Sequence, residues 1–542
     1  MKTNNNENPA KSTGILGNKV YLYLTEFFAG MSVMAVELGA SRLLAPYFSS
    51  SQIVWTIIIG TIMIAMALGN IYGGRSADRD PDPDKLYKRL LISAVWTAAI
   101  PIIGKLVILL VSGALVFTIS TNFLIWAAFL SCMLVFVYPL FLLGTCTPSL
   151  VKYTVGSLDD SGKTVGMLGA SNTVGSIIGT FVPTFLSIPA FGTAVTFLIF
   201  SGILLIIAAV YFISCKRCIV RVCVSGAIFA LCCIFGTSAG FAFWEKDLTY
   251  EGESVYNYLQ VKEDDRRVIL STNVLFGVQS VAMKDGGLSG LYYDTALAAP
   301  MMTDKPLGKD SDVLVLGMGS GTYAAECAEF IEGAKVEGVE IDESITDLAR
   351  EYFGLPESVT VTTYDGRAFL NVSDKKYDVI MVDAYQDITI PFQMSSVEFF
   401  TLVRDHLTEG GVMVVNMNMK SDRAGSVNDR LIATIAEVFP EIYTADVPRS
   451  TNRELFASLD PNMTEKLKNS VDLIDDPMLS LTMNEVYGRL TRRTAPEGCD
   501  PLTDDRAPVE LLGMQVIDDL ISEELQYYKD VVREKGIQGL LE

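Results

Sequence analysis

Histidine is almost absent from this chain, which holds a single one, His406, among its 542 residues. Zinc sites built on imidazole ligands and Ser-His-Asp catalysis both need histidine, so the sequence comes close to excluding them. We therefore expect no metal site. Proton transfer in any reaction would then depend on carboxylate, tyrosine or lysine side chains.

Cysteine is scarce in the second half of the chain. Seven of the nine cysteines lie before residue 245, in apolar sequence where cysteine usually packs as a small apolar residue. The other two, Cys327 and Cys499, are far apart in the sequence. The polar half therefore shows no disulfide framework.

Positive charge is also scarce in the second half. Residues 245–542 contain 27 Lys and Arg against 54 Asp and Glu, a net charge of −27, whereas residues 1–244 carry +6. A domain this acidic repels a phosphate backbone, so we do not expect nucleic acid as a partner. The acidity is consistent with high solubility or with a cationic substrate.

Long apolar stretches dominate the first half of the chain. Each approaches or exceeds the roughly 20 residues that a helix needs to cross a bilayer. They cover residues 20–41, 53–72, 90–110, 123–145, 164–187, 193–213 and 222–244. The first stretch is too long for a cleavable signal peptide. We predict a polar tail over residues 1–19 and a membrane domain of about seven helices over residues 20–244, embedded in a lipid bilayer.

Lys and Arg gather before the first apolar stretch and in every second loop after it, Arg42 being the exception. Such loops usually face the cytoplasm, so the N-terminus is predicted to be cytoplasmic. Seven crossings would place the acidic half outside the cell, but a single re-entrant stretch would reverse that. The side of the acidic half stays open.

Two carboxylates lie inside the first apolar stretch, Glu26 and Glu37. A charged carboxylate within a bilayer is costly unless it is paired or faces a cavity. Arg42 is a candidate partner for Glu37. A structural ion pair and a role toward a substrate remain equally open for these two residues.

The acidic half begins with short segments rich in β-branched and aromatic residues, at 254–261, 267–272 and 276–281. They predict a small antiparallel sheet within residues 250–300. An apolar strand at 313–316 then opens into Gly317, Gly319 and Gly321, followed by a helix. Such a turn lets a ligand approach the backbone and the free N–H groups of the helix.

Three carboxylates follow the next predicted strands: Glu340, Asp365 and Asp383, with Asp387 just beyond the last. Ligands of an open parallel sheet bind at the carboxyl ends of its strands, so these side chains should share one crevice with the glycine loop. Alternatively, each acid could simply cap the following helix. We predict a Rossmann-like α/β domain over residues 301–542.

The chain resembles the spermidine synthase family, and more closely its membrane-fused branch. The resemblance rests on MSVMAVELGASRLLAPYFSSSQIVW (31–55), GNIYGGRSADR (69–79), GVQSV (277–281), GLYYD (290–294), the glycine loop, VEGVEID (336–342), TYDGRAFL (363–370), YDVIMVDAY (377–385), NRELFAS (452–458) and PLTDDRAPVE (501–510). It implies a multi-pass α-helical membrane domain, then a small β-sheet and a methyltransferase-type Rossmann domain.

The resemblance also implies an activity, the transfer of an aminopropyl group from decarboxylated S-adenosylmethionine to a polyamine such as putrescine. Asp383 would be the catalytic acid residue that deprotonates the attacking amine. Glu340 would bind the ribose and Asp365 the adenine amino group. The remaining implied contacts are Gly317, Gly319, Ser320, Gly321 and Gly366 to the donor, and Gln279, Tyr292 and Asp387 to the amine. A homodimer is left open.

Three motifs depart from the family pattern. Ser320 stands where the family's GGGDG loop has an aspartate, Gln386 and Asp387 alter its DSSD stretch, and Tyr293 replaces a common histidine. These changes remove contacts to cationic amines. They keep two alternatives open: an S-adenosylmethionine-dependent methyltransferase, or a non-enzymatic polyamine transporter or sensor.

Overall fold

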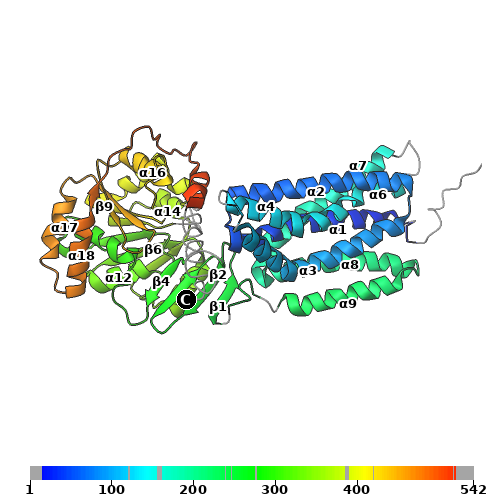
Figure 1. Ribbon diagram of the computed structural model, residues 1–542, viewed down its shortest axis with the longest axis horizontal. Coiled ribbons are helices and arrows are strands. Elements are labelled where there is room, and N and C mark those ends of the chain that lie inside the picture. The colour runs from blue at the N-terminus through cyan, green and yellow to red at the C-terminus, as the bar shows by residue number, and fades with distance from the viewer. Residues whose placement is uncertain are drawn as a thin grey trace, which may run out of the picture. The chain divides into compact units, whose positions relative to one another are not determined.

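The computed structural model describes two compact units, Met1–Trp244 and Glu245–Glu542 (Figure 1). The residues that it describes are 15–16, 18–116, 118–119, 122–154, 161–237, 240–245, 247–274, 278–384, 390–418, 420–516 and 518–519. Asp387, predicted to contact the amine, lies outside them. Each unit is described separately below.

The first unit is helical. Its elements are α1 (Lys19–Phe48), α2 (Gln52–Arg79), α3 (Pro83–Val116), α4 (Phe123–Val135), α5 (Val137–Gly144), α6 (Cys146–Thr154), α7 (Ser161–Val182), the π-helix η2 (Pro183–Ser187), α8 (Ile188–Ser214) and α9 (Ile219–Gly236). Within the described residues, five helical segments are long and apolar enough to cross a membrane, or six if the bent run from α4 to α6 is one span. One of the five is the whole 54-residue run Ser161–Ser214.

Helix α7 packs along α1 in the same direction. A Cβ atom on Gly175 would lie 1.9 Å from the carbonyl oxygen of Phe27, and one on Gly179 would lie 2.1 Å from that of Met31. Residue numbers thus rise together along both helices. The contact requires glycine because the two backbones touch directly, as in other small-residue membrane interfaces.

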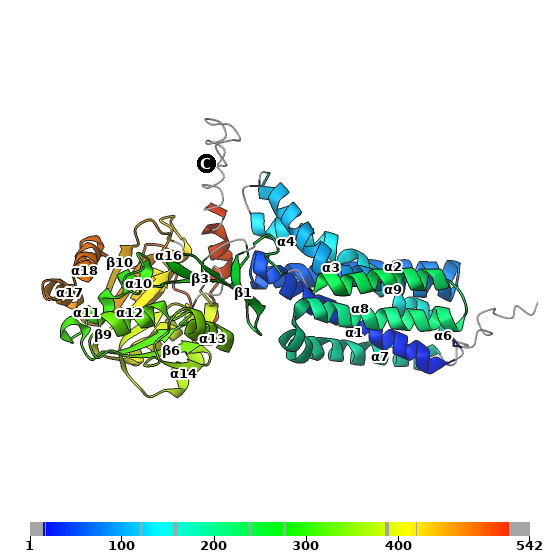
Figure 2. The same ribbon diagram turned by 90° about the horizontal axis from the view of Figure 1, so that it is seen from below.

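Helix α8 packs along α1 in the opposite direction. Tyr21 donates a hydrogen bond to the carbonyl oxygen of Ile207 at 2.7 Å, and Ser32 donates one to that of Phe200 at 3.5 Å. The run Ser161–Ser214 therefore consists of two antiparallel arms, with the non-helical Gly192 (φ 80°, ψ 170°) close to the turn (Figure 2). A straight helix of that length would measure about 80 Å, far more than a bilayer core of about 30 Å.

The same kind of contact gives the directions of the other helices. Helix α3 is parallel to α1, and α9 is antiparallel to α8. The run α4–α6 is antiparallel to α3 and parallel to α2. These directions follow from the pairs Thr25–Tyr87, Leu43–Gly104, Trp96–Val135, Ser93–Pro139, Gly69–Phe141, Gly73–Thr145, Gly202–Phe229 and Leu198–Cys232. The described part of the unit thus has seven helical arms that alternate in direction.

Ion pairs gather at the end of this unit where α1 begins. Lys152 of α6 lies 2.8 Å from Asp78 of α2, and Arg217, just after α8, lies 3.5 Å from Asp84 of α3. Glu26, deeper in α1, is fully buried and accepts hydrogen bonds from Thr147 and Asn172 at 2.5 and 2.9 Å. Its oxygen Oε1 is thus satisfied by neutral donors.

The second unit begins with a four-stranded antiparallel sheet, in the order β1 (Leu248–Glu253), β2 (Tyr258–Glu263), β3 (Arg267–Ser271) and β4 (Ser280–Met283). The first predicted strand, 254–261, is corrected by this pairing. Its first half forms the turn between β1 and β2, where Ser254 accepts hydrogen bonds from the backbone of Tyr256 and Asn257. Strand β1 itself was not predicted, because LTYEGE is mostly polar.

The main sheet has eight strands in the order β12-β10-β11-β9-β8-β5-β6-β7. They are β5 (Asp312–Leu316), β6 (Lys335–Glu340), β7 (Thr360–Thr363), β8 (Tyr377–Val382), β9 (Leu407–Met417), β10 (Glu441–Asp446), β11 (Arg453–Ser458) and β12 (Thr491–Arg492). Strands β7, β6, β5, β8 and β9 are parallel, and β11 pairs antiparallel with β9. The predicted fold class, apolar helices followed by a small sheet and a Rossmann-like domain, is confirmed.

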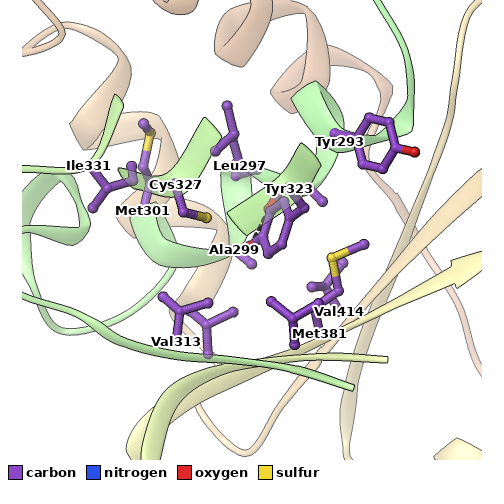
Figure 3. Close-up of a cluster of buried hydrophobic side chains, with 14 of the residues drawn as sticks. Tyr293, Leu297, Ala299, Met301, Val313, Tyr323, Cys327, Ile331, Met381 and Val414 are labelled. Atoms are coloured by element: carbon purple, nitrogen blue, oxygen red, sulfur yellow. Dashed lines mark hydrogen bonds between the residues drawn. The ribbon is translucent and has the colours of Figure 1, made fainter. Parts of the chain in front are cut away.

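Alternate residues of the central strands face two hydrophobic layers. Val313, Met381 and Val414 join one layer (Figure 3), whereas Leu314 and Ile380 join the other. Helices α10 (Tyr292–Ala296), α11 (Ala298–Met301), α12 (Thr322–Phe330), α17 (Met463–Val471) and α18 (Pro477–Arg489) cover the first layer. Helices α14 (Gly366–Val372), α15 (Val397–Asp405) and α16 (Val427–Ala436) cover the second, and α13 (Glu343–Tyr352) packs beside the small sheet.

The backbone contact between α1 and α7 gives a first prediction. Gly175→Ala should lower the melting temperature of the detergent-solubilised chain, because the new methyl group forces the helices apart at a cost of about 1–3 kcal/mol. Gly169→Ala is the matched control, since a Cβ there meets nothing within 4 Å. Thermal unfolding followed by size-exclusion chromatography measures both variants, and equal melting temperatures would contradict the packing.

Candidate active site

The glycine loop follows β5 and is built on left-handed backbone. Gly317, Gly319 and Gly321 have φ angles of 79°, 56° and 78°, which residues with a Cβ rarely adopt. A Cβ on Gly317 would lie 2.5 Å from the Cα of Ala384, which follows β8. Glycine thus brings the loop against the end of the neighbouring strand. The loop leads into the first N–H groups of α12, an arrangement that suits a polar ligand.

Glu340 is the last residue of β6. Its Oε2 accepts a hydrogen bond from the N–H of Gly319 at 2.9 Å, and its Oε1 accepts one from the N–H of Asp342 at 3.1 Å. Burial outweighs these hydrogen bonds and raises the pKa of Glu340 to about 7. Glu340 therefore ties the glycine loop to β6, while Asp342 rather than Glu340 caps helix α13.

Asp365 follows β7 and does cap a helix. Its Oδ1 accepts a hydrogen bond from the N–H of Ala368 at 2.7 Å at the start of α14. The helix-cap interpretation is therefore correct for this acid. The side chain is half-buried and still lines the cleft described below.

Asp383 follows β8 and holds two strong side-chain hydrogen bonds. The hydroxyl of Tyr292 donates to its Oδ2 at 2.5 Å, and the amide of Asn416 donates to its Oδ1 at 2.8 Å. Asn452 in turn donates to the Oδ1 of Asn416 at 2.8 Å. Burial raises the pKa of Asp383 to about 7, so this carboxylate can accept a proton near neutral pH.

Tyr292 and Tyr293 form an aromatic pair beside Asp383, with ring centroids 3.9 Å apart. Burial and the negative charge of Asp383 raise the pKa of both phenols. Tyr292 therefore keeps its proton and remains a hydrogen-bond donor to the carboxylate. The side chain of Tyr293 is almost fully buried.

These elements enclose a cleft at the carboxyl ends of the parallel strands, where open α/β sheets bind their ligands. Seven predicted residues line it: Gln279, Gly317, Gly319, Glu340, Asp365, Gly366 and Asp383. Ser320 and Gly321 do not line it. Ser320 is buried behind the loop, with its hydroxyl 3.1 Å from that of Thr322.

Several lining residues were not predicted. They are Tyr256, Asn257, Thr272, Ile341, Tyr364, Gln393 and Met394. Tyr256 and Asn257 were missed because their segment was assigned to a strand rather than to a turn. Asn416, which supports Asp383, was missed as well. An asparagine within the apolar run VMVVNM of β9 was the available signal, because buried amides need partners.

The arrangement joins two chemical capacities in one cleft. Glycine backbone, Glu340 and Asp365 offer hydrogen-bonding groups for a ligand with several hydroxyl and amino groups. Asp383, held by Tyr292 and Asn416, offers a proton acceptor poised near neutral pH. The site is thus suited to deprotonate a nucleophile beside a bound polar ligand.

The chain is similar to several known proteins. A model of the spermine/spermidine synthase domain matches residues 291–462. A protein of Bifidobacterium longum (strain NCC 2705), described as a probable polyamine aminopropyl transferase, is 52% identical over 347 residues, covering 61% of this chain and 77% of the relative. A polyamine aminopropyltransferase of Vibrio vulnificus (strain CMCP6) is 26% identical over 242 residues, 43% of this chain and 78% of the relative.

A crystal structure of a probable spermidine synthase from Corynebacterium glutamicum ATCC 13032 also aligns with the chain. The alignment has a TM-score of 0.36 and 19% sequence identity, and it covers 47% of this chain and 99% of that chain.

The raised pKa values predict how stability depends on pH. The folded-state pKa values of Glu340 and Asp383, about 7, lie above those of unfolded chains, near 4. The stability that these carboxyls contribute is complete below about pH 4 and is lost as the pH rises through 7. The melting temperature of the α/β unit should therefore fall from pH 5 to 7 and level off above pH 7.

Asp383→Asn should make that fall smaller, because asparagine does not titrate. Its single amide oxygen can accept the hydrogen bond from Asn416, and its NH₂ group can donate to the hydroxyl of Tyr292. Differential scanning fluorimetry of the full chain at pH 5, 6, 7 and 8 measures the effect. Equal slopes in the wild type and the variant would contradict the burial of Asp383.

Proposed function

Because this chain belongs to the spermine/spermidine synthase family of polyamine aminopropyltransferases, we propose that its α/β unit transfers an aminopropyl group from decarboxylated S-adenosylmethionine to a polyamine such as putrescine. The observation that carries the proposal is the position of Asp383. It lines the same cleft as Glu340 and is hydrogen-bonded by Tyr292 and Asn416.

The donor side of the cleft is formed by β5, β6 and β7. Glu340 would accept hydrogen bonds from the ribose hydroxyls, and Asp365 with Gly366 would contact the adenine. Gly317 and Gly319 leave room for the donor beside the backbone, and a Cβ on Gly319 would already lie 2.9 Å from the hydroxyl of Ser280. Ser320 and Gly321 would shape the loop from behind.

The acceptor side is formed by Asp383 and its neighbours. We assign Gln279, Tyr292 and Asp387 to the amine, the first because it lines the cleft and the second because it holds Asp383. The amine nitrogen attacks the CH₂ group beside the sulfonium, a C–N bond forms, and the C–S bond breaks to release methylthioadenosine. The nitrogen gives up one proton, which Asp383 accepts.

Positioning supplies most of the catalysis in such a displacement, because no covalent intermediate with the protein is needed. Asp383 is poised to accept a proton because burial has raised its pKa close to ambient pH. Tyr292 and Asn416 fix the direction of the two carboxylate oxygens. The reacting nitrogen therefore meets a base in a single orientation.

Methyl transfer from S-adenosylmethionine is the second candidate, because the glycine loop carries Ser320 in place of an acid. The structure weakens this argument for methyl transfer. The hydroxyl of Ser320 faces Thr322 and does not line the cleft, so the position says little about the donor. The 52% identical relative supports aminopropyl transfer.

Two substitutions should separate catalysis from donor binding. Asp383→Asn should lower kcat by roughly 10²–10⁴-fold, the usual contribution of a general base, while donor affinity stays within about twofold. Glu340→Gln should instead weaken donor binding, because it removes one charged acceptor of hydroxyl hydrogen bonds.

The assay measures spermidine and methylthioadenosine formed from putrescine and decarboxylated S-adenosylmethionine, with calorimetry for donor affinity. Wild-type protein that forms no product from saturating substrates would refute the proposed reaction. Tighter binding of S-adenosylmethionine than of its decarboxylated form would favour methyl transfer.

We further propose that the first unit crosses the membrane seven times with its N-terminal end in the cytoplasm. Its seven helical arms alternate in direction, so residues 18 and 245 emerge on opposite faces. The end where α1 begins carries most of the positive charge: Lys19, Arg75, Arg79, Lys85, Lys88, Arg89, Lys152, Lys163, Lys216, Arg217 and Arg221. Positive loops stay in the cytoplasm. Residues 245–542 would then lie outside it.

Protease treatment of intact bacterial spheroplasts tests this orientation. The α/β unit should be digested while an N-terminal epitope tag survives until the cells are lysed. The internal control is the tag itself, which shares the chain and its expression level. Protection of the α/β unit until lysis would show that the number of crossings is even.

A further inference from the structure

Glu454 is a buried carboxylate that the proposed reaction does not yet use. It lies in β11 with no measurable exposure to solvent, and neither of its carboxylate oxygens has a hydrogen-bond partner among the described residues. A charged carboxylate in such a position costs several kcal/mol unless a cation or a donor compensates it. We therefore expect a cation or a hydrogen-bond donor to compensate the buried carboxylate of Glu454.

Strand pairing places Glu454 next to the catalytic cluster. In the antiparallel ladder it stands directly opposite Asn416 of β9. Side chains opposite each other project from the same face, with Cβ atoms about 5 Å apart. Asn416 is the residue whose amide donates to Asp383. Glu454 is therefore separated from Asp383 by a single side chain, at the same edge of the sheet.

The electrostatics of this edge of the sheet is consistent with that proximity. Burial raises the pKa of Glu454 well above its ordinary value, and the negative charge of Asp383 raises it further. The adjacent cation, Arg453, points to the other face of the strand, where it binds Asp446 and Asp422 at 2.6 and 3.0 Å. The described residues thus bring two carboxylates together without a cation between them.

The strand face that carries Glu454 continues into apolar and aromatic residues. Phe456, two residues along the same strand face, and Val414, two residues before Asn416, belong to the hydrophobic layer that also contains Tyr293 and Tyr323 (Figure 3). Aromatic faces attract alkylammonium groups, and methylene chains pack against apolar walls. The environment suits an alkyl chain that ends in an ammonium group.

We propose that Glu454 binds the second ammonium group of the acceptor, while its reacting nitrogen lies at Asp383. This assignment rests on the proposed transfer reaction and names the residue that distinguishes a diamine acceptor from a monoamine. Each carboxylate then receives a positive partner on binding. The donor's own ammonium group is the other source of the same chemistry, and measuring donor affinity in the variant distinguishes the two.

The test compares two acceptors of equal length, putrescine and butylamine, in wild-type protein and in Glu454→Gln. A hydrogen bond to a charged group is worth roughly 1.5–3 kcal/mol, so the preference for putrescine, measured as a ratio of kcat/KM values, should fall about 10–100-fold in the variant. Affinity for decarboxylated S-adenosylmethionine, measured by calorimetry, should stay within about twofold. Glutamine preserves the shape of the side chain, and thermal unfolding checks the fold.

Glu326→Gln is the matched control. Glu326 of α12 is also buried with both oxygens unpartnered among the described residues, but it is not on the strand that faces Asn416. It should leave the preference for putrescine unchanged. An equal loss of preference in both variants would overturn the assignment by showing a general effect of buried charge.

Two further results would overturn the assignment. An unchanged putrescine preference in Glu454→Gln would remove Glu454 from the acceptor site. Weakened donor binding with an unchanged preference would assign it to the donor's ammonium group. Both results require active wild-type protein, so they are distinct from the absence of any product in the wild type, which refutes the proposed function itself.

Discussion

The parallel pairing of β5 with both of its neighbours is the constraint on which the site depends. Val313 pairs with Val336 of β6 on one side and with Val379 of β8 on the other. Because the strands are parallel and in register, they end at the same edge. Gly317, Glu340 and Asp383 follow from those three endings, and the direct contact of Gly317 with the backbone of Ala384 holds the loop against β8.

This arrangement has an energetic cost, because it buries acidic side chains. Glu340, Asp383 and Glu454 are brought to one edge of the sheet, and burial raises the pKa of each. A fold selected for stability alone would replace them by apolar residues of similar volume. Their presence is consistent with a site that gains favourable interactions only when a cationic ligand arrives. The acidic composition of residues 245–542 is consistent with the same preference, as it is with high solubility.

Much of this could be predicted from the sequence, for a definite physical reason. Gly317, Glu340, Asp365 and Asp383 each follow an apolar segment, and parallel strands must deliver such residues to one edge. Asn416, Asn452 and Glu454 could not be predicted in the same way. Their position depends on which strands pair and in which register, and the antiparallel β11 reaches the edge at its beginning rather than at its end.

The membrane half shows the same division. Hydropathy located the apolar stretches, because the length of a crossing is set by the bilayer. The partners of Glu26 were not predictable, since Thr147 and Asn172 belong to helices far along the chain. The family resemblance assigned Ser320 to the donor, but its buried hydroxyl lies 3.1 Å from that of Thr322 and the side chain does not line the cleft.

The glycine contact between α1 and α7 has a consequence for how the protein is made. Glu26 meets its amide partner 146 residues later in the chain, so at roughly 5–20 residues per second about 7–30 s of translation separate the two helices. In the proposed membrane topology, α1 therefore inserts before α7 has been made, with the carboxylate of Glu26 still lacking the amide of Asn172. Pairing of α1 with α7 is then a late step in the assembly of the helical unit.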